Sequence, residues 1–129
     1  MPMITDILEL TQDLMRIPSM HSRPEEIMRC ADFILNWCAD NGITARKIEH
    51  NGTPSILVLP DGPARLLLMT HFDVVDAPKE LFVPRIDGDR LFGRGAIDDK
   101  YAVALSLILF RDRLRDLGTR GKSQTDMAL

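Results

Sequence analysis

The chain has 129 residues, of which 45% are hydrophobic and 27% are charged, a composition typical of a globular protein that buries about two-thirds of its unfolded surface. The formal net charge is −3 at pH 7 and no basic run is present, which argues against nucleic acid or anionic lipid as a partner. The first residues lack a basic region and contain several acidic side chains, so they predict neither a signal peptide nor a membrane span. We therefore expect one cytoplasmic domain.

The only two cysteines, Cys30 and Cys38, lie in one segment of helical apolar period. On a helix they would be about 12 Å apart, which is too far for a disulfide between them. Neither a Cys-x-x-Cys pair nor a zinc-type spacing of Cys and His is present. We expect both to be buried, unreactive thiols.

Two amphipathic helices are predicted for the first third of the chain, over residues 3–16 and 24–41, because apolar residues recur there at helical spacing. Ser22 and Glu25 have the spacing of a capping box at the start of the second helix. Gly42 follows its predicted end and can adopt the left-handed conformation that stops a helix.

Strands are predicted next. Residues 43–49 and 55–59 flank Asn51-Gly52, which is a typical hairpin turn. Residues 65–70 read RLLLMT, an apolar run typical of a central strand that is covered on both faces. His71 would then lie at the carboxyl end of that strand, and open α/β sheets bind their ligands at this edge.

The remaining pattern predicts a short edge hairpin around Asp87-Gly88, a helix from about Asp98 to Leu117 that ends at Gly118, and, in residues 121–129, a linker followed by the opening of another strand. Together these elements predict an α/β fold, with an open, mixed, mostly parallel sheet flanked by helices in three layers.

His71-Phe72-Asp73 is the first candidate for chemistry. Side chains two residues apart in an extended segment point the same way. The imidazole could therefore bind a metal while the carboxylate holds its other ring nitrogen. The same pair could equally be a structural hydrogen bond, which the motif alone does not exclude.

Residues 93–100 read GRGAIDDK and are the second candidate. The two glycines permit a close backbone approach, and the paired acids Asp98 and Asp99 come directly before an apolar helix. Capping of that helix, worth about 0.3–1 kcal/mol, is the simpler explanation of the acids. Arg94 and Lys100 are expected to form local ion pairs.

LLLMTHFDVV followed by LFGRGAIDDKYAVA resembles the two leading motifs of the dinuclear zinc amidohydrolase and metallopeptidase family that includes acetylornithine deacetylase, succinyl-diaminopimelate desuccinylase, aminoacylase and glutamate carboxypeptidase. The order and separation of the motifs match, and so do the helices and hairpin before them. The resemblance implies a hydrolase of amide bonds in N-acyl amino acids or short peptides, with a partial zinc-exopeptidase-like catalytic domain.

The resemblance also implies residue roles. His71 would bind one of two zinc ions, for which Co²⁺ or Mn²⁺ could substitute, and Asp98 would bridge both. Asp73 would be the catalytic-site carboxylate that supports His71. The peptide bond between Asp98 and Asp99 would be cis.

The family's general base is the first of two adjacent glutamates after the next strand, and no such pair follows Asp99 here. Glu25-Glu26 lies far upstream in a capping context. Residues 1–129 are therefore expected to be the amino-terminal part of the catalytic domain, without its remaining segment or the dimerisation domain, and to be inactive alone. Lys100-Tyr101 stands where many relatives have Lys-Gly, which leaves the substrate subclass open.

Two other hypotheses stay open. The chain could be a non-catalytic module that self-associates through an exposed sheet edge, and a homo-oligomer is possible. Alternatively, His71 and the acids could form only a structural network without metal. Light scattering would test the first hypothesis and zinc titration the second.

Overall fold

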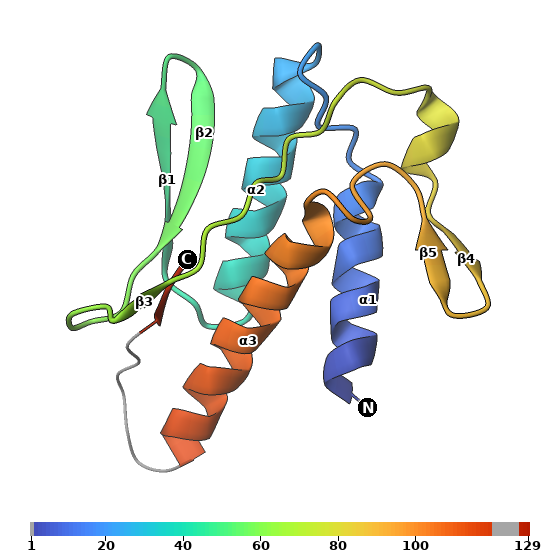
Figure 1. The fold of residues 1–129 in the computed structure, drawn as a ribbon. Coiled ribbons are helices and arrows are strands. Elements are labelled where there is room, and N and C mark those ends of the chain that lie inside the picture. The colour runs from blue at the N-terminus through green and yellow to red at the C-terminus, as the bar shows by residue number, and fades with distance from the viewer. Residues whose placement is uncertain (1, 120–126) are drawn as a thin grey trace.

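The computed structural model describes residues 2–119 and 127–129. In chain order the elements are α1 (Pro2–Met15), α2 (Pro24–Asp40), β1 (Ala45–His50), β2 (Thr53–Val58), β3 (Leu66–Leu67), a 3₁₀ helix (Lys79–Phe82), β4 (Arg85–Asp87), β5 (Arg90–Phe92), α3 (Lys100–Thr119) and β6 (Met127–Ala128) (Figure 1). The predicted α/β class is confirmed. Among the helices described, none combines the length and the apolar character that crossing a membrane requires.

The strands form three pairs. β1 pairs antiparallel with β2, β4 pairs antiparallel with β5, and β3 pairs parallel with β6. Both hairpins are joined by tight turns, which permit only antiparallel pairing. Consequently the described strands are not the mostly parallel sheet that we expected. The predicted strand opening near the carboxyl end is confirmed as β6, whereas the predicted linker falls on residues 120–126, outside the described part.

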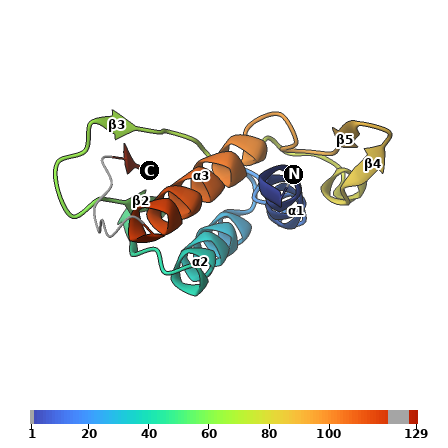
Figure 2. The same cartoon turned by 90° about the horizontal axis from the view of Figure 1, so that it is seen from below.

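The apolar run at residues 65–70 differs from the prediction. Only Leu66 and Leu67 form a strand, and their exposed fractions are 48% and 56%, while that of Met69 is 83%. β3 lies at the margin of the molecule and pairs with β6 (Figure 2). Because a central strand needs cover on both faces, this segment has the composition of a buried strand without its burial.

The core lies among the helices and on the inner face of the β1–β2 hairpin. α3 packs along α1, and α2 packs on β1 and β2 (Figures 1 and 2). Leu10, Leu14, Ile34 and Cys38 are buried, as the helical period of the first two helices predicts. In α3 the period predicted Ala102, Leu105 and Leu109 as core positions, but these are only half-buried, whereas Val103, Leu107 and Ile108 are buried. α3 begins at Lys100 rather than Asp98, and Gly118 lies inside it.

The capping box predicted for α2 is wrong. Arg23 occupies the N-cap without a side-chain cap, and Pro24 is at the start of the helix. The Ser22 N–H instead donates to Asp76 Oδ1 at 3.2 Å. A tertiary contact with the segment after β3 therefore replaces the local cap.

Cys30 and Cys38 are both fully buried and free, as predicted. Burial raises the pKa of the Cys38 thiol from 9.0 to about 11. Burial is also the main cause of the raised pKa of Cys30, partly opposed by the charge of Lys100. The neutral thiol is the form that the core holds.

This shift predicts a loss of stability at alkaline pH. Between pH 9 and 11 the unfolded chain has lost the Cys38 proton that the folded chain retains, so the free energy of unfolding falls as pH rises, by up to about 3 kcal/mol. Urea unfolding at pH 8, 9 and 10 should show a steeper decline for the wild type than for Cys38→Ala. Parallel declines would contradict the assignment.

Candidate metal centre

Residues 71–76 follow β3 and are held against the loop between α1 and α2. Val74 N–H donates to Ser19 O at 2.9 Å, and His21 N–H donates to Val74 O at 3.2 Å. The Ser19 hydroxyl donates to Phe72 O at 2.5 Å. These bonds join two segments that lie more than fifty residues apart in the sequence, and they fix the backbone on which His71 and Asp73 stand.

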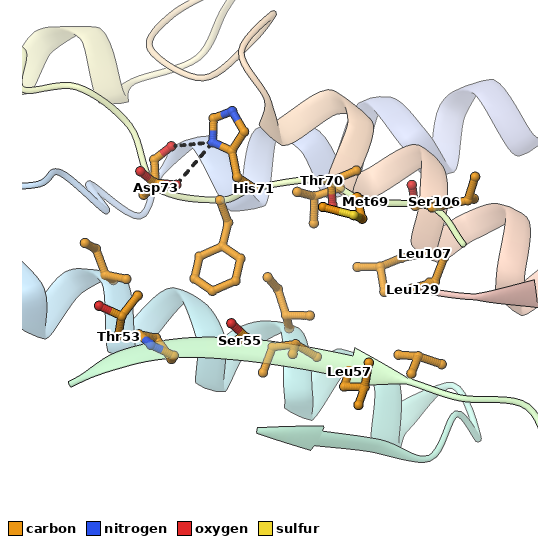
Figure 3. A pocket seen from close by; sticks show the side chains of 18 of the residues that line it. Thr53, Ser55, Leu57, Met69, Thr70, His71, Asp73, Ser106, Leu107 and Leu129 are labelled. Carbon is orange, nitrogen blue, oxygen red and sulfur yellow. Dashed lines mark hydrogen bonds and ion pairs between the residues drawn. The ribbon is translucent and has the colours of Figure 1, made fainter. Parts of the chain in front are cut away.

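The structure brings His71, Asp73 and Asp98 together. His71 Nε2 lies 2.9 Å from Asp98 Oδ1. His71 Nδ1 lies 3.2 Å from Asp73 Oδ1 and 3.1 Å from the Asp73 backbone oxygen (Figure 3). Each ring nitrogen therefore faces a different acid, and the two motifs seen in the sequence form one cluster.

The loop from Gly93 to Asp99 carries the second motif. Gly93 and Gly95 have φ of 144° and 88°, values that side-chain-bearing residues rarely adopt. The peptide bond between Asp98 and Asp99 is cis, as expected. Asp99 Oδ2 accepts a hydrogen bond from the His71 N–H at 3.3 Å, so each of the paired acids contacts the same histidine.

His21 is a member of this cluster that our sequence analysis missed. Its Nε2 lies 2.6 Å from Asp73 Oδ2, which places Asp73 between two histidines. His21 follows the first helix in an irregular loop and lies 52 residues from Asp73. No local motif could have identified it, because only the pairing of this loop with residues 72–74 brings it near.

The pKa values of the cluster follow from these contacts. Partial burial alone would lower the pKa of His71, but the hydrogen bond to Asp98 and the contacts with Asp73 raise it overall. Partial burial alone would raise the pKa of Asp73, but the hydrogen bond from His21 and the charge of His71 lower it overall. Each shift stabilises the charged form of its own group, the imidazolium of His71 and the carboxylate of Asp73.

The ion pairs expected of Arg94 and Lys100 are not found among the described residues. Lys100 is completely buried, and its Nζ donates to the backbone oxygens of Leu14 and Ile17 at 2.7 and 2.6 Å. Burial lowers its pKa to about 8. Arg94 Nε is buried with no hydrogen-bond partner in the described part of the chain. Through its two hydrogen bonds, Lys100 anchors the loop of residues 93–99 to the end of α1.

The donor set fits a metal in type but is incomplete. Zinc takes histidine nitrogen and carboxylate oxygen, and a carboxylate commonly holds the other ring nitrogen of a metal-bound histidine. His71 Nε2, Asp98 Oδ1 and Asp73 match this arrangement. However, within residues 2–119 and 127–129, no group of three or more His, Cys, Asp and Glu is placed to hold a metal ion.

The His71 cluster lies at one end of a groove of about 640 Å³. β2 forms one wall, residues 67–73 form the other, and α3 contributes Ser106 and Leu107 (Figure 3). The lining is largely apolar, and His21, His71 and Asp73 are its ionisable members. The groove therefore leads from the core to the cluster.

Comparisons with known proteins agree with this arrangement. Residues 67–123 match the family described as peptidase family M20/M25/M40. The chain is 30% identical over 132 aligned positions to a succinyl-diaminopimelate desuccinylase from Bradyrhizobium sp. (strain ORS 278), in a match that covers 92% of this chain and 33% of the relative.

Two solved structures share the fold. One is an M20 family metallo-carboxypeptidase, Sso-CP2, from Sulfolobus solfataricus, with a TM-score of 0.72, 21% identity, and coverage of 95% of this chain and 29% of that one. The other is the di-peptidase Dug1p from Saccharomyces cerevisiae, with a TM-score of 0.70, 21% identity, and coverage of 91% and 30%. The chain spans about a third of the length of the curated relative. The segment that matches the M20/M25/M40 peptidase family contains both motifs of the cluster.

Proposed function

We propose that residues 1–129 are the amino-terminal part of the catalytic domain of a zinc-dependent hydrolase that cleaves amide bonds of N-acyl amino acids or short peptides. The observation that carries this proposal is the convergence of His71 Nε2 and Asp98 Oδ1 at 2.9 Å, with Asp73 on the other ring nitrogen. Cytoplasmic location and a small-molecule substrate remain predictions, as does the absence of nucleic-acid and membrane partners.

His71 and Asp98 would hold the metal, with Asp98 available to bridge two ions. Bound metal would supply Lewis-acid polarisation of the amide carbonyl and a water of lowered pKa. The chain's own groups orient the ligands. With Asp73 accepting from Nδ1 of His71, Nε2, which lies 2.9 Å from Asp98 Oδ1, would face the metal, and Asp99 fixes the His71 backbone. Zinc is the expected metal, and Co²⁺ or Mn²⁺ would also suit these donors.

The general base and the remaining ligands are proposed to lie outside these 129 residues, together with the dimerisation domain. Glu25 and Glu26 lie in the first turn of α2, and Glu26 pairs with Arg29 at 2.6 Å. Glu26 is thus engaged in a local ion pair, and both acids lie at a helix start, where the helix dipole stabilises negative charge. We accordingly expect no appreciable turnover from this chain alone.

The proposal is tested by zinc titration followed by NMR of the histidine side chains. The wild type should bind weakly, with the largest shifts at His71. His71→Ala and Asp98→Ala should each weaken binding about tenfold or more, since either change removes one of only two ligands. His50→Ala is the matched control, because His50 lies on the β1–β2 hairpin, and should leave binding unchanged.

Equal zinc affinity in all four proteins would contradict a metal site at His71 and support the purely structural interpretation. Incompleteness needs a separate assay, with N-acyl amino acids and dipeptides as substrates. Zinc-dependent hydrolysis by the wild type that disappears in His71→Ala would show that the 129 residues suffice and would overturn that part of the proposal.

A further inference from the structure

Asp73 uses its two carboxylate oxygens to contact two different histidines. Oδ1 lies 3.2 Å from His71 Nδ1 (Figure 3), and Oδ2 lies 2.6 Å from His21 Nε2. The terminal torsion of an aspartate side chain has broad energy wells, so the longer contact alone does not fix the rotation of the carboxylate. Because both oxygens belong to one planar group, the shorter contact with His21 sets the direction in which Oδ1 faces His71.

The backbone that carries His21 is fastened to the segment that carries Asp73. The His21 N–H donates to Val74 O at 3.2 Å, and the N–H of the next residue, Ser22, donates to Asp76 Oδ1 at 3.2 Å. Two successive hydrogen bonds therefore hold this loop on both sides of the contact with Asp73. Support of this kind is what keeps a side chain of a functional site in its working geometry.

The metal role proposed for His71 requires one particular tautomer. Nε2 can bind a metal only when it carries no proton, so the proton of the neutral ring must be on Nδ1. Asp98 Oδ1 lies 2.9 Å from Nε2 and favours the opposite tautomer, in which Nε2 is the donor. The two acids thus compete for the proton of one imidazole.

Asp73 offers two acceptors on the Nδ1 side of this competition. One is its backbone oxygen at 3.1 Å from His71 Nδ1, and the other is Oδ1 at 3.2 Å. Only the carboxylate is charged, and hydrogen bonds to a charged acceptor are the stronger kind. It can accept only while it faces Nδ1, which is the orientation that the contact with His21 maintains.

We propose that His21 is a positioning residue of the metal centre, a role that rests on the proposed function of His71 as a ligand. His21 Nε2 donates to Asp73 Oδ2 and holds the carboxylate so that Oδ1 accepts from His71 Nδ1. The proton of the neutral His71 ring then stays on Nδ1, and Nε2 is free for the metal. His21 acts through Asp73 and is not itself a ligand.

A contribution to folding does not account for the contact between His21 and Asp73. Their side chains are 59% and 42% exposed, and ion pairs of exposed side chains contribute little to stability. The His21→Ala variant should therefore fold, with a urea midpoint close to that of the wild type. His21→Phe keeps an aromatic ring without a donor and serves in its place if His21→Ala is unstable.

The first test is the tautomer of His71 in the metal-free protein, read from NMR of the ring nitrogens with His71→Ala to identify the signals. At about pH 8.5, where neutral imidazoles predominate, the wild type should be mainly the Nδ1–H tautomer. His21→Ala should shift the tautomer ratio about threefold or more toward Nε2–H. His21→Gln should restore the ratio, because its amide can donate from near the position of Nε2.

The second test is a double-mutant cycle in zinc affinity. His21→Ala should weaken zinc binding about threefold to tenfold, which is less than the loss of a ligand. In the Asp73→Ala background the same change should have no effect, because no carboxylate remains to be positioned. His50→Ala is again the matched control and should change neither the affinity nor the tautomer of His71.

An unchanged His71 tautomer in His21→Ala would overturn the proposal. So would an equal loss of zinc affinity in the wild-type and Asp73→Ala backgrounds, since His21 would then bind zinc directly. If zinc does not bind at His71 while its tautomer still responds to His21, the proposed function fails and the positioning of Asp73 by His21 is supported. The two proposals can therefore be rejected separately.

Discussion

Replacing Lys100 with alanine should lower the free energy of unfolding by about 3 kcal/mol. The change removes the buried stem of the side chain and the charged donor to the oxygens of Leu14 and Ile17, each of which keeps one backbone N–H donor. Relief from burying a cation offsets part of this loss. Urea unfolding with the linear extrapolation measures the change.

Two comparison variants separate the contributions. Lys100→Met keeps most of the apolar stem but not the ammonium group. Its free energy of unfolding should therefore lie between those of the wild type and Lys100→Ala. Exposed Lys79 is the matched control, and Lys79→Ala should change stability by less than about 0.5 kcal/mol. If Lys100→Ala were as stable as Lys79→Ala, Lys100 would not anchor the loop of Asp98 to α1.

Gly93→Ala should cost a similar amount, also about 3 kcal/mol. At φ 144° a Cβ would lie 2.5 Å from Met15 Cε and 3.0 Å from the backbone oxygen of Leu81. The methionine end can move, but the backbone oxygen cannot move far, because it accepts the Arg94 N–H at 2.7 Å. Thermal and urea unfolding would measure the loss.

Two other glycines are internal controls for Gly93. Gly52 has φ 79° with open space around its Cβ position, so Gly52→Ala should cost only about 1 kcal/mol from backbone conformation. Gly118 lies inside α3, also in open space, and Gly118→Ala should stabilise by about 0.5–1 kcal/mol. A Gly93→Ala cost no greater than that of Gly52→Ala would mean that the contact with Leu81 is not limiting.

Local patterns predicted the regular elements because their causes are local. The apolar period specified the three helices, and Asn51-Gly52 adopts the positive φ angles that its hairpin turn requires. The apolar run before His71 predicted a buried central strand, but Leu66 and Leu67 are exposed. An apolar composition shows that a segment can be buried, but it does not show which other segments cover it. The capping box failed for a related reason, since Ser22 found its partner in Asp76.

By itself the sequence determined the helices, the hairpins and the two motifs of the candidate metal centre, residues 71–73 and 93–100. Each of these depends on residues that are close together in the chain. Only the tertiary structure decided that His21 contacts Asp73 and that Lys100 is a buried anchor rather than half of an ion pair. These features depend on contacts between segments from 50 to more than 80 residues apart. Packing of the whole chain sets such contacts, and no local period or spacing encodes them.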